Sequence, residues 1–280
     1  MTESRFHPVH ICGLAAVKAC FQHRPAALKK LWFAPEHTTA LAEIRTALAR
    51  EKHPFAQATH STLAHIAGHT AHGGVIALTE RPLPAIPKPA DFDRWRAEGN
   101  PLVLLDDLPD PLQLGAIARV AAACGVKRLL LGARTKDALF EERAWSTANG
   151  ALDTLTCHDA GTLSVTLRNL SDRFCIAGFV RPGGRRIDDL KPIKVPGRPL
   201  AIVFGDTPGG LGTDIASKCE FLLHIPGVEG NTLLNASDAA AFGLPWLLRK
   251  ERTKPTGFLA RKRARHGTHA NDPSSATTNP

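Results

Sequence analysis

Residues 225–237 have the sequence IPGVEGNTLLNAS and lie between an apolar strand and an alanine-rich helix. The strand is predicted over 221–225, and Asn235 stands where the helix would open. A strand that ends in a polar, glycine-containing loop and continues as a helix presents backbone N–H and C=O groups at one point. In α/β proteins, ligands bind there, at the carboxyl ends of strands. Taken alone, the loop is better explained as an ordinary connection, but two upstream segments change that interpretation.

The first upstream segment is DPLQLGAIAR, residues 110–119, which follows a predicted strand and begins a helix. Asp110 suits the N-cap and Pro111 the first helical position. Gly115 is unusual inside a helix, where glycine costs up to ~1 kcal/mol relative to alanine. Close approach of another chain or of a ligand would justify it. Arg119 lies one turn further along the same face, and in isolation it is better explained as a solvated arginine.

The second upstream segment is IVFGDTPGGL, residues 202–211, in which an apolar strand enters a turn with three glycines. Glycine allows a ligand to touch the backbone, because no Cβ is in the way. The segment is neither a Walker loop nor a GxGxxG fingerprint. By itself it is equally consistent with a plain strand–helix loop.

The composition indicates a globular protein of 280 residues, a length typical of two domains. No apolar run approaches ~18 residues, so we expect no transmembrane helix. The N-terminus leads into no signal-like apolar core, which favours a cytoplasmic location. The six cysteines are scattered without a CxxC pair, and we expect buried free thiols rather than disulfides or zinc ligands.

The positive charge is concentrated at the C-terminus. The net charge is +9, and residues 249–280 contribute +6 of it, from eight Lys/Arg against Glu251 and Asp272, which leaves +3 for residues 1–248. A basic tail binds polyanions through phosphate contacts and counterion release. A purely solubilising tail is the equally favoured alternative.

The order of predicted elements indicates an α/β protein with two folded units. Residues 1–80 form a small α/β unit, 81–98 a proline-rich linker without regular structure, 99–252 the main domain and 253–280 a disordered basic tail. The main domain alternates strands and helices, which predicts a mostly parallel sheet covered on both faces. Its strands are predicted at 102–105, 128–131, 175–180, 200–204 and 221–225. Its helices are predicted at 113–124, 137–148, 162–172, 211–218 and 235–250.

Together and in this order, the three segments resemble the SpoU/TrmH branch of the SPOUT RNA methyltransferases. The family's motifs are roughly DPxNxGxIxR, then GNExxG, then IP…SLNxS. The chain keeps the following motif residues: Asp110, Pro111, Gly115, Ile117, Arg119, Gly205, Gly210, Leu211, Ile225, Pro226, Leu234, Asn235 and Ser237. The N-terminal region, with HICG at 10–13 and HGGV at 72–75, is similar to the family's L30e-like substrate-binding domain. The resemblance covers residues 6–250.

The resemblance implies a SPOUT α/β-knot, a mostly parallel sheet with a deep trefoil knot, preceded by the small L30e-like domain. It further implies that S-adenosylmethionine is the cofactor. By carry-over from the motifs, Gly205, Ile225 and Leu234 contact the cofactor largely through their backbone, and Gly210 belongs to the same set.

The resemblance also implies the reaction and the partners. Arg119 and Asn235 are the catalytic candidates for methylation of a ribose 2′-hydroxyl in structured RNA, either tRNA or rRNA. Arginine is a poor base, so we assign Arg119 to positioning of a phosphate or hydroxyl. The transfer itself would depend on proximity and alignment. Family members are usually homodimers with the active site at the knot–knot interface, and we expect no membrane or metal partner.

Five motif positions depart from the family pattern. Gln113 replaces an asparagine, Asp206-Thr207 replaces Asn-Glu, Gly227 replaces a methionine and Leu233 replaces a serine. Loss of an active-site hydroxyl removes a hydrogen-bonding partner, which costs ~1–3 kcal/mol where the other group stays buried. An alternative function is therefore a catalytically impaired SPOUT protein that binds RNA, with or without S-adenosylmethionine. The intact Arg119 and Asn235 favour the enzyme.

The N-terminal unit is rich in histidine, which raises the alternative of a metal site. The residues concerned are His53, His60, His65, His69 and His72. They form no HExxH arrangement and have no nearby cysteine in sequence. We expect surface histidines of an RNA-binding domain and no metal ligands.

Overall fold

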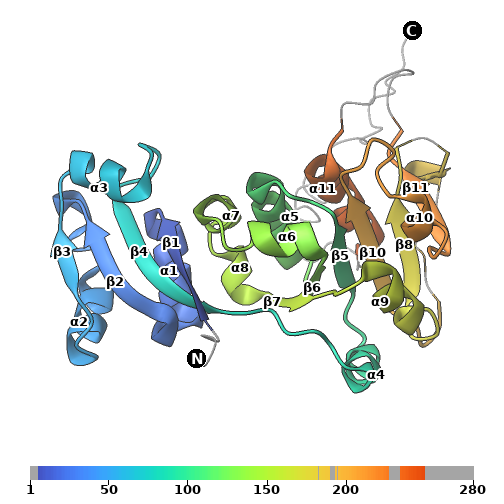
Figure 1. The fold of residues 1–280 in the computed structure, drawn as a ribbon, viewed down its shortest axis with the longest axis horizontal. Helices are drawn as coiled ribbons and strands as arrows, with labels where there is room; N and C mark the ends of the chain where they lie inside the picture. Colours follow the sequence, from blue (N-terminus) through green and yellow to red (C-terminus); the bar gives the residue numbers. More distant parts are fainter. Residues whose placement is uncertain (1–5, 182, 190–192, 194, 227–233, 250–280) are drawn as a thin grey trace, which may run out of the picture. The chain divides into compact units, whose positions relative to one another are not determined.

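A computed structural model of the chain describes residues 6–181, 183–189, 193, 195–226 and 234–249 (Figure 1). The described residues up to Leu248 belong to one compact unit that contains two β-sheets. The predicted loop at 227–233, including Gly227 and Leu233, and the predicted tail at 253–280 lie outside the described residues.

The N-terminal sheet has four strands in the order β1-β4-β2-β3. β4 pairs antiparallel with both β1 and β2, and β2 pairs parallel with β3. Its strands are β1 (Phe6–Cys12), β2 (Leu28–Phe33), β3 (Phe55–Gln57) and β4 (Val75–Pro82). Its helices are α1 (Leu14–His23), α2 (Ala42–Arg50) and α3 (His60–Ala67), with short 3-10 turns at η1 (Pro25–Ala27) and η2 (Pro35–His37). The predicted small α/β unit is confirmed, although β1 and β3 were not predicted.

The second sheet has seven strands in the order β7-β6-β5-β10-β8-β11-β9, and every pairing is parallel. Its strands are β5 (Leu102–Asp106), β6 (Arg128–Leu131), β7 (Thr156–Asp159), β8 (Cys175–Phe179), β9 (Arg185–Arg186), β10 (Leu200–Gly205) and β11 (Phe221–His224). The helices are α4 (Pro89–Glu98), α5 (Pro111–Ala123), α6 (Ala133–Ala138), α7 (Glu142–Ala148), α8 (Ala151–Thr154), α9 (Leu163–Leu170), α10 (Thr213–Ala216) and α11 (Ala236–Leu247), with a 3-10 turn η3 (Ile187–Asp189). The predicted parallel α/β sheet is confirmed.

Successive residues of β5 explain why this sheet needs helices on both faces. Leu102 and Leu104 pack into one apolar cluster with α4, α9 and α10. Val103 and Leu105 pack into another cluster with α5, α7, α8 and α11, which continues into the N-terminal sheet. Side chains alternate across a strand, so a strand that is apolar at every position is stable only between two covered faces.

Three predicted segments differ from the structure. The helix predicted over 137–148 is divided into α6 and α7, because Leu139 and Phe140 turn into the core between them. The helix predicted over 211–218 is limited to α10. The proline-rich segment was expected to hold no regular element, yet β4 continues through Pro82 and α4 begins at Pro89. Proline fits both places, since Pro82 is the last residue of β4 and Pro89 is the first residue of α4.

The predicted free thiols are confirmed, and none of the six cysteines is paired. Cys12, Cys20 and Cys175 are buried, whereas Cys124, Cys157 and Cys219 are half-buried. Within the described ranges, no helix combines the length and apolar character needed to cross a membrane.

Candidate functional site

The first two motif segments meet at the carboxyl ends of two neighbouring strands. β5 and β10 pair in parallel, and Gly205 at the end of β10 lies opposite Asp106 at the end of β5. The chain leaves β5 to start α5 and leaves β10 to form the 205–210 loop. The Gln113 side-chain Nε2 of α5 donates to Oδ2 of Asp206 at 3.3 Å. Two segments that are 93 residues apart are therefore joined directly at this edge.

The glycines of the second segment permit a tight turn. Thr207 and Gly210 exchange backbone hydrogen bonds of 3.3 and 2.8 Å, and Gly210 has φ +90°. A Cβ at Gly205 would lie 2.5 Å from the carbonyl oxygen of Gly210. A Cβ at Gly210 would lie 2.9 Å from the carbonyl oxygen of Phe179. Both glycines are buried and are thus required by close packing, Gly205 within the loop and Gly210 against the end of β8.

Carboxylates set the electrostatics of the same edge. Burial raises the pKa of Asp106, and the negative charges of Asp107 and Asp214 raise it further. Asp206 is half-buried and lies 3.9 Å from the Arg181 guanidinium, measured from Oδ1 to Nη2. Gln113 Oε1 is buried and has no hydrogen-bond partner among the described residues. The edge thus combines negative charge with an unsatisfied acceptor, which suits a ligand with cationic or hydrogen-bond-donating groups.

The third segment is described at its two ends. Ile225 follows β11 and packs against the main apolar cluster, while Leu234 is exposed. The helix opens at Asn235 as predicted, and Asn235 is the N-cap of α11: its Oδ1 accepts from the Asp238 backbone N–H at 3.0 Å and from the Ser237 hydroxyl at 2.7 Å. The Asn235 side-chain oxygen therefore has a structural task that the motif comparison did not predict.

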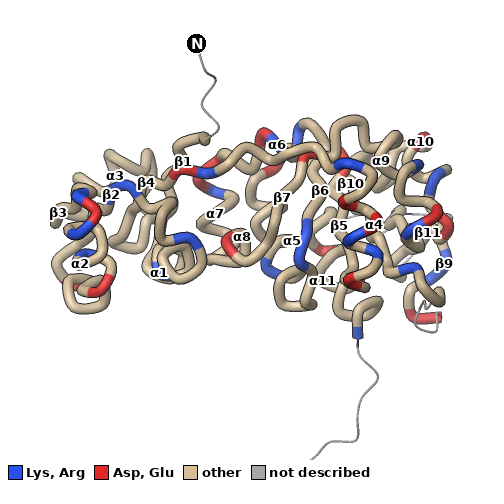
Figure 2. The backbone as a smooth tube through the Cα atoms, turned by 90° about the horizontal axis from the view of Figure 1, so that it is seen from below, with Lys and Arg blue, Asp and Glu red and all other residues tan. Residues whose placement is uncertain are grey.

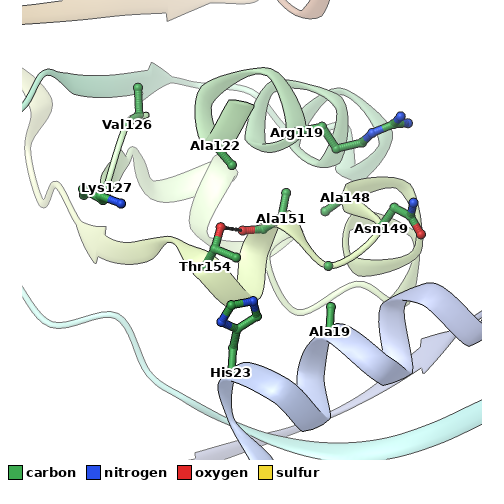
Figure 3. Close-up of a pocket in the computed structure, with 11 residues that line it drawn as sticks. Ala19, His23, Arg119, Ala122, Val126, Lys127, Ala148, Asn149, Ala151 and Thr154 are labelled. Atoms are coloured by element: carbon green, nitrogen blue, oxygen red, sulfur yellow. Dashed lines mark hydrogen bonds between the residues drawn. The ribbon is translucent and has the colours of Figure 1, made fainter. Parts of the chain in front are cut away.

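Arg119 lies in a different setting, an open cavity of about 520 Å³ (Figure 3). In the close-up, Arg119 projects from α5 on the same side as Asn149, while His23 comes from α1. The basic residues lining the cavity are Arg119, His23 and Lys127. Arg119 follows Gln113 by six residues, which amounts to about 9 Å along the helix axis and about 240° of rotation. Arg119 and Gln113 thus leave α5 in different directions, so the described part of the chain does not bring Arg119 together with Gly205 and Gly210.

Gly115 has an explanation that differs from the one expected. A Cβ at this position would lie 2.5 Å from the Ala144 carbonyl oxygen and 2.9 Å from the Ala148 backbone nitrogen. The glycine is needed because α7 of the same chain crosses α5 here, and neither a ligand nor another chain is involved in that contact. The consequence for the site is indirect, because the close crossing holds Ala148 and Asn149 beside Arg119 in the cavity wall.

The histidine-rich segment does not form a single cluster. His60 pairs with Glu36 at 2.7 Å between Nε2 and Oε1, and His69 pairs with Glu142 at 3.0 Å. The expectation of surface histidines is wrong for His72, which is buried, and burial lowers the pKa of its imidazole. Its Nδ1 accepts the Gly74 backbone N–H and so holds the turn before β4.

Family models match both units of the chain. The model described as "SpoU rRNA Methylase family" matches residues 100–244, and the one described as "RNA 2'-O ribose methyltransferase substrate binding" matches residues 10–85. The chain belongs to the SpoU rRNA methylase family, and the resemblance found in its sequence motifs is confirmed.

A curated relative is an uncharacterized tRNA/rRNA methyltransferase of Mycobacterium avium, 34% identical over 160 residues. That match covers 56% of this chain and 50% of the relative, so the chain spans about half the length of the relative in the match. Two crystal structures share the fold: an AdoMet-bound rRNA methyltransferase from Sinorhizobium meliloti and the SpoU methyltransferase AviRb from Streptomyces viridochromogenes in complex with AdoMet. The Sinorhizobium structure has a TM-score of 0.68 at 18% sequence identity, and the match covers 86% of each chain. The AviRb structure has a TM-score of 0.66 at 19% sequence identity, and the match covers 86% of this chain and 89% of AviRb.

Sequence reasoning missed some residues that the fold brings to these places. Asp106 and Arg181 lie at the strand ends beside the 205–210 loop, and His23 and Lys127 line the cavity around Arg119. The position of Asp106 directly after a buried strand was a signal that could have identified it. The other three carry no local pattern, because only the packing of distant elements places them.

Proposed function

We propose that this chain is an S-adenosylmethionine-dependent RNA methyltransferase acting on a ribose 2′-hydroxyl of tRNA or rRNA. The observation that carries the proposal is the junction of the first two motifs, where Gln113 bonds Asp206 beside Gly205. Parallel α/β sheets bind their ligands at such strand ends. Membership of the SpoU family and the domain match at residues 10–85 support RNA as the substrate.

The residues at this edge fit the proposed cofactor. S-adenosylmethionine carries a cationic sulfonium and an ammonium group, and Asp106 and Asp206 supply negative charge at the strand ends. Backbone at Gly205 and Gly210 and the apolar Ile225 and Leu234 would hold the rest of the molecule. When bound, the cofactor supplies the methyl group, and the chain supplies geometry. The trefoil knot implied by the family resemblance is part of this proposal.

The cavity around Arg119 is the proposed place for the RNA backbone. Arg119, His23 and Lys127 line it, and all three are exposed. Figure 2 shows basic residues on both α1 and α5. One helix from each of the two sheets therefore contributes positive charge at the cavity. Basic side chains bind phosphates without reading sequence, and structured RNA is recognised largely by shape. Arg119 would position the phosphate or the ribose hydroxyl, and the basic tail would add affinity that weakens with salt.

A homodimer completes the proposal. Arg119 and Gln113 leave α5 in different directions, so a second copy would be needed to bring Arg119 to a cofactor edge. The helices α5 and α11 pack against each other. Three large apolar side chains on them are exposed: Leu112 on α5, and Phe242 and Trp246 on α11. Apolar side chains grouped on a surface favour association with another protein surface. We expect Phe242→Asp to convert dimers to monomers in light scattering, with Val165→Asp on α9 as the control.

A second candidate function is an RNA-binding protein without turnover. Thr207 favours it, since this position lacks the family's carboxylate and its backbone is engaged with Gly210. The Asn235 side-chain oxygen is likewise occupied as the cap of α11. This alternative predicts RNA and cofactor binding with no methyl transfer.

The deciding experiment compares RNA from cells with and without the gene. Ribose methylation is mapped across total RNA, and the sites lost on deletion identify the substrate for assays with purified protein and labelled S-adenosylmethionine. Arg119→Ala should abolish methyl transfer while leaving cofactor affinity within about twofold, since Arg119 is assigned to the RNA phosphate or hydroxyl and not to the cofactor. The control Arg168→Ala removes an exposed arginine from α9 on the other face of the sheet and should leave transfer unchanged.

Two outcomes would contradict the proposal. If no methylation is lost on deletion and the purified protein methylates none of the cell's RNA, the enzyme is excluded and the RNA-binding alternative gains. If calorimetry detects no binding at millimolar S-adenosylmethionine, the cofactor assignment itself is wrong.

A further inference from the structure

Three side chains with metal-binding atoms converge where the N-terminal sheet meets α7. Cys12 is the last residue of β1, His69 follows α3, and Glu142 is the first residue of α7. One donor atom from each, the cysteine sulfur, an imidazole nitrogen and a carboxylate oxygen, lies within 4.8 Å of the other two. Cys12 is 4% exposed, and the Glu142 side chain is 16% exposed. The three donors come from separate parts of the chain, yet they face one point.

We propose that Cys12, His69 and Glu142 form a binding site for a divalent transition metal of the Zn²⁺ class. Thiolate, imidazole and carboxylate are the ligands that zinc takes in proteins. Mg²⁺ and Ca²⁺ prefer sites made of oxygen alone, and the sulfur of Cys12 selects against them. Three protein ligands leave a fourth tetrahedral position for water, which makes this an open site.

The surroundings of the trio support a built site. The Ser146 hydroxyl, one turn along α7, donates to Oε1 of Glu142, while Oε2 lies 3.0 Å from His69 Nε2. The same Ser146 oxygen accepts the Cys12 backbone N–H at 3.3 Å. One residue thereby fixes two of the three ligands, which is the task of the hydrogen-bonding groups that surround metal ligands. His69 Nδ1 is buried and has no hydrogen-bond partner among the described residues, so the imidazole is incompletely satisfied by protein alone.

The competing explanation is a hydrogen-bonded contact between two packed elements. Burial raises the pKa of the Cys12 thiol, and the charge of Glu142 raises it further, so the metal-free cysteine carries a proton. A zinc ion would displace that proton and convert the thiol to a thiolate ligand. The two explanations differ in one measurable respect, because a hydrogen-bonded network has no metal affinity to lose.

The test uses the full-length protein, stripped of metal with a chelator and titrated with Zn²⁺ against a chromophoric competitor. We expect one zinc ion per chain, and a thiolate-to-cobalt absorption band when Co²⁺ replaces zinc. Cys12→Ser should remove that band, and Cys12→Ser, His69→Ala and Glu142→Gln should each weaken zinc binding by more than the roughly 10–100-fold typical of losing a supporting residue such as Ser146.

Matched controls share the chemistry but lie outside the trio. Cys20→Ser replaces a buried cysteine of α1, His65→Ala an exposed histidine of α3 and Glu141→Gln the carboxylate beside Glu142, and each should leave zinc affinity within about twofold. Unchanged affinity in Cys12→Ser, or a Co²⁺ spectrum of the wild-type protein without a thiolate band, would overturn the site. The spectrum decides the matter even if the ligand variants fail to fold.

Discussion

Two polar regions of this molecule differ in how deeply they are buried and in how closely their charges are paired. The first is the arginine junction, made of Arg81, Asp153, Arg24 and Trp145, where β4 packs against α7 and α8. The Arg81 and Asp153 side chains are each 2% exposed and form an ion pair, and the Arg81 guanidinium lies 3.7 Å from the centre of the Trp145 ring. Arg24 donates to the Asp153 carbonyl oxygen at 3.4 Å and to that of Leu155 at 2.9 Å.

The second region is the motif-loop site, made of the 205–210 loop, Asp106 and Gln113. Its polar groups are half-buried and more loosely paired: Asp206 lies 3.9 Å from the Arg181 guanidinium, and burial raises the pKa of Asp106. Each region keeps one buried atom without a hydrogen-bond partner among the described residues, Gln113 Oε1 here and Arg81 Nη2 in the arginine junction. A buried charge is tolerated only where a partner is fixed. A site that must bind a ligand leaves polar groups for that ligand to satisfy. The comparison therefore predicts that substitutions in the deeply buried pair affect the stability of the fold, and that substitutions in the half-buried site affect binding.

Breaking the arginine junction should have the largest effect on stability. Asp153→Ala leaves the Arg81 charge buried and unpaired, which we expect to cost about 3–5 kcal/mol of unfolding free energy. Urea denaturation measures it. The control replaces both partners, Arg81→Met with Asp153→Leu, and should lose much less, because no buried charge remains. If the single variant loses less than about 1 kcal/mol of unfolding free energy, the buried ion pair contributes no more than an exposed surface pair, and the prediction is wrong.

The helix crossing at Gly115 should be the next most sensitive position. Gly115→Ala forces a methyl group against the backbone of α7, and we expect a loss of about 1–3 kcal/mol. An alanine at an ordinary helix position would instead gain up to about 1 kcal/mol over glycine. The sign of the change in thermal or urea unfolding therefore tests the close crossing, and a gain would contradict it.

Substitutions in the motif-loop site should alter binding more than stability. We expect Asp206→Asn to cost less than about 1.5 kcal/mol of unfolding free energy. It should weaken S-adenosylmethionine binding by roughly tenfold, equivalent to about 1.4 kcal/mol, as measured by calorimetry. Asp93→Asn, which weakens a shorter and more exposed ion pair with Arg173 at 2.6 Å on the far side of the sheet, should leave cofactor affinity unchanged. Equal effects of the two variants would remove the distinction between the regions.

The smallest expected effect is a pH-dependent gain in Asp106→Asn. Burial raises the pKa of Asp106 above its ordinary 3.8, so the folded protein keeps this proton at a pH where the unfolded chain has released it. The unfolded state then binds fewer protons, and the wild type loses stability as pH rises through that window. The variant lacks this loss, so its advantage in urea denaturation should grow from about pH 4 towards neutrality. An advantage that is constant with pH would contradict the raised pKa.

The sequence predicted the elements that have strong local signals. β6 has the predicted bounds, because the apolar run Leu129–Leu131 stands between two basic residues and a glycine. α11 opens at Asn235, where a helix was expected to begin. Strands without such a signal were missed. β7 has the sequence TCHD at the edge of its sheet, and β3 is exposed along its length. Edge strands bury little apolar surface, so their sequences lack the pattern that identifies central strands.

The strand ends that border the candidate site also have strong local signals in the sequence. The sequence located the ends of β5 and β10 to within one residue, because glycines and capping residues mark where strands stop and helices start. The sequence could not show that Gln113 bonds Asp206, or that Arg119 lies in a cavity with His23 of α1. Nor could it show why position 115 is glycine, since that reason lies in the backbone of α7.

By itself, the sequence determined an α/β chain with a parallel sheet, its family, and the strand ends where a ligand is expected, because hydrophobic periodicity, caps and motif spacing are local properties. The tertiary structure alone decided which distant groups meet. Cys12 lies 134 residues from Ser146, to which its backbone is bonded, and Arg81 lies 72 residues from Asp153. Such contacts arise from the packing of whole elements around shared apolar clusters, and no residue's immediate neighbours in the chain encode them.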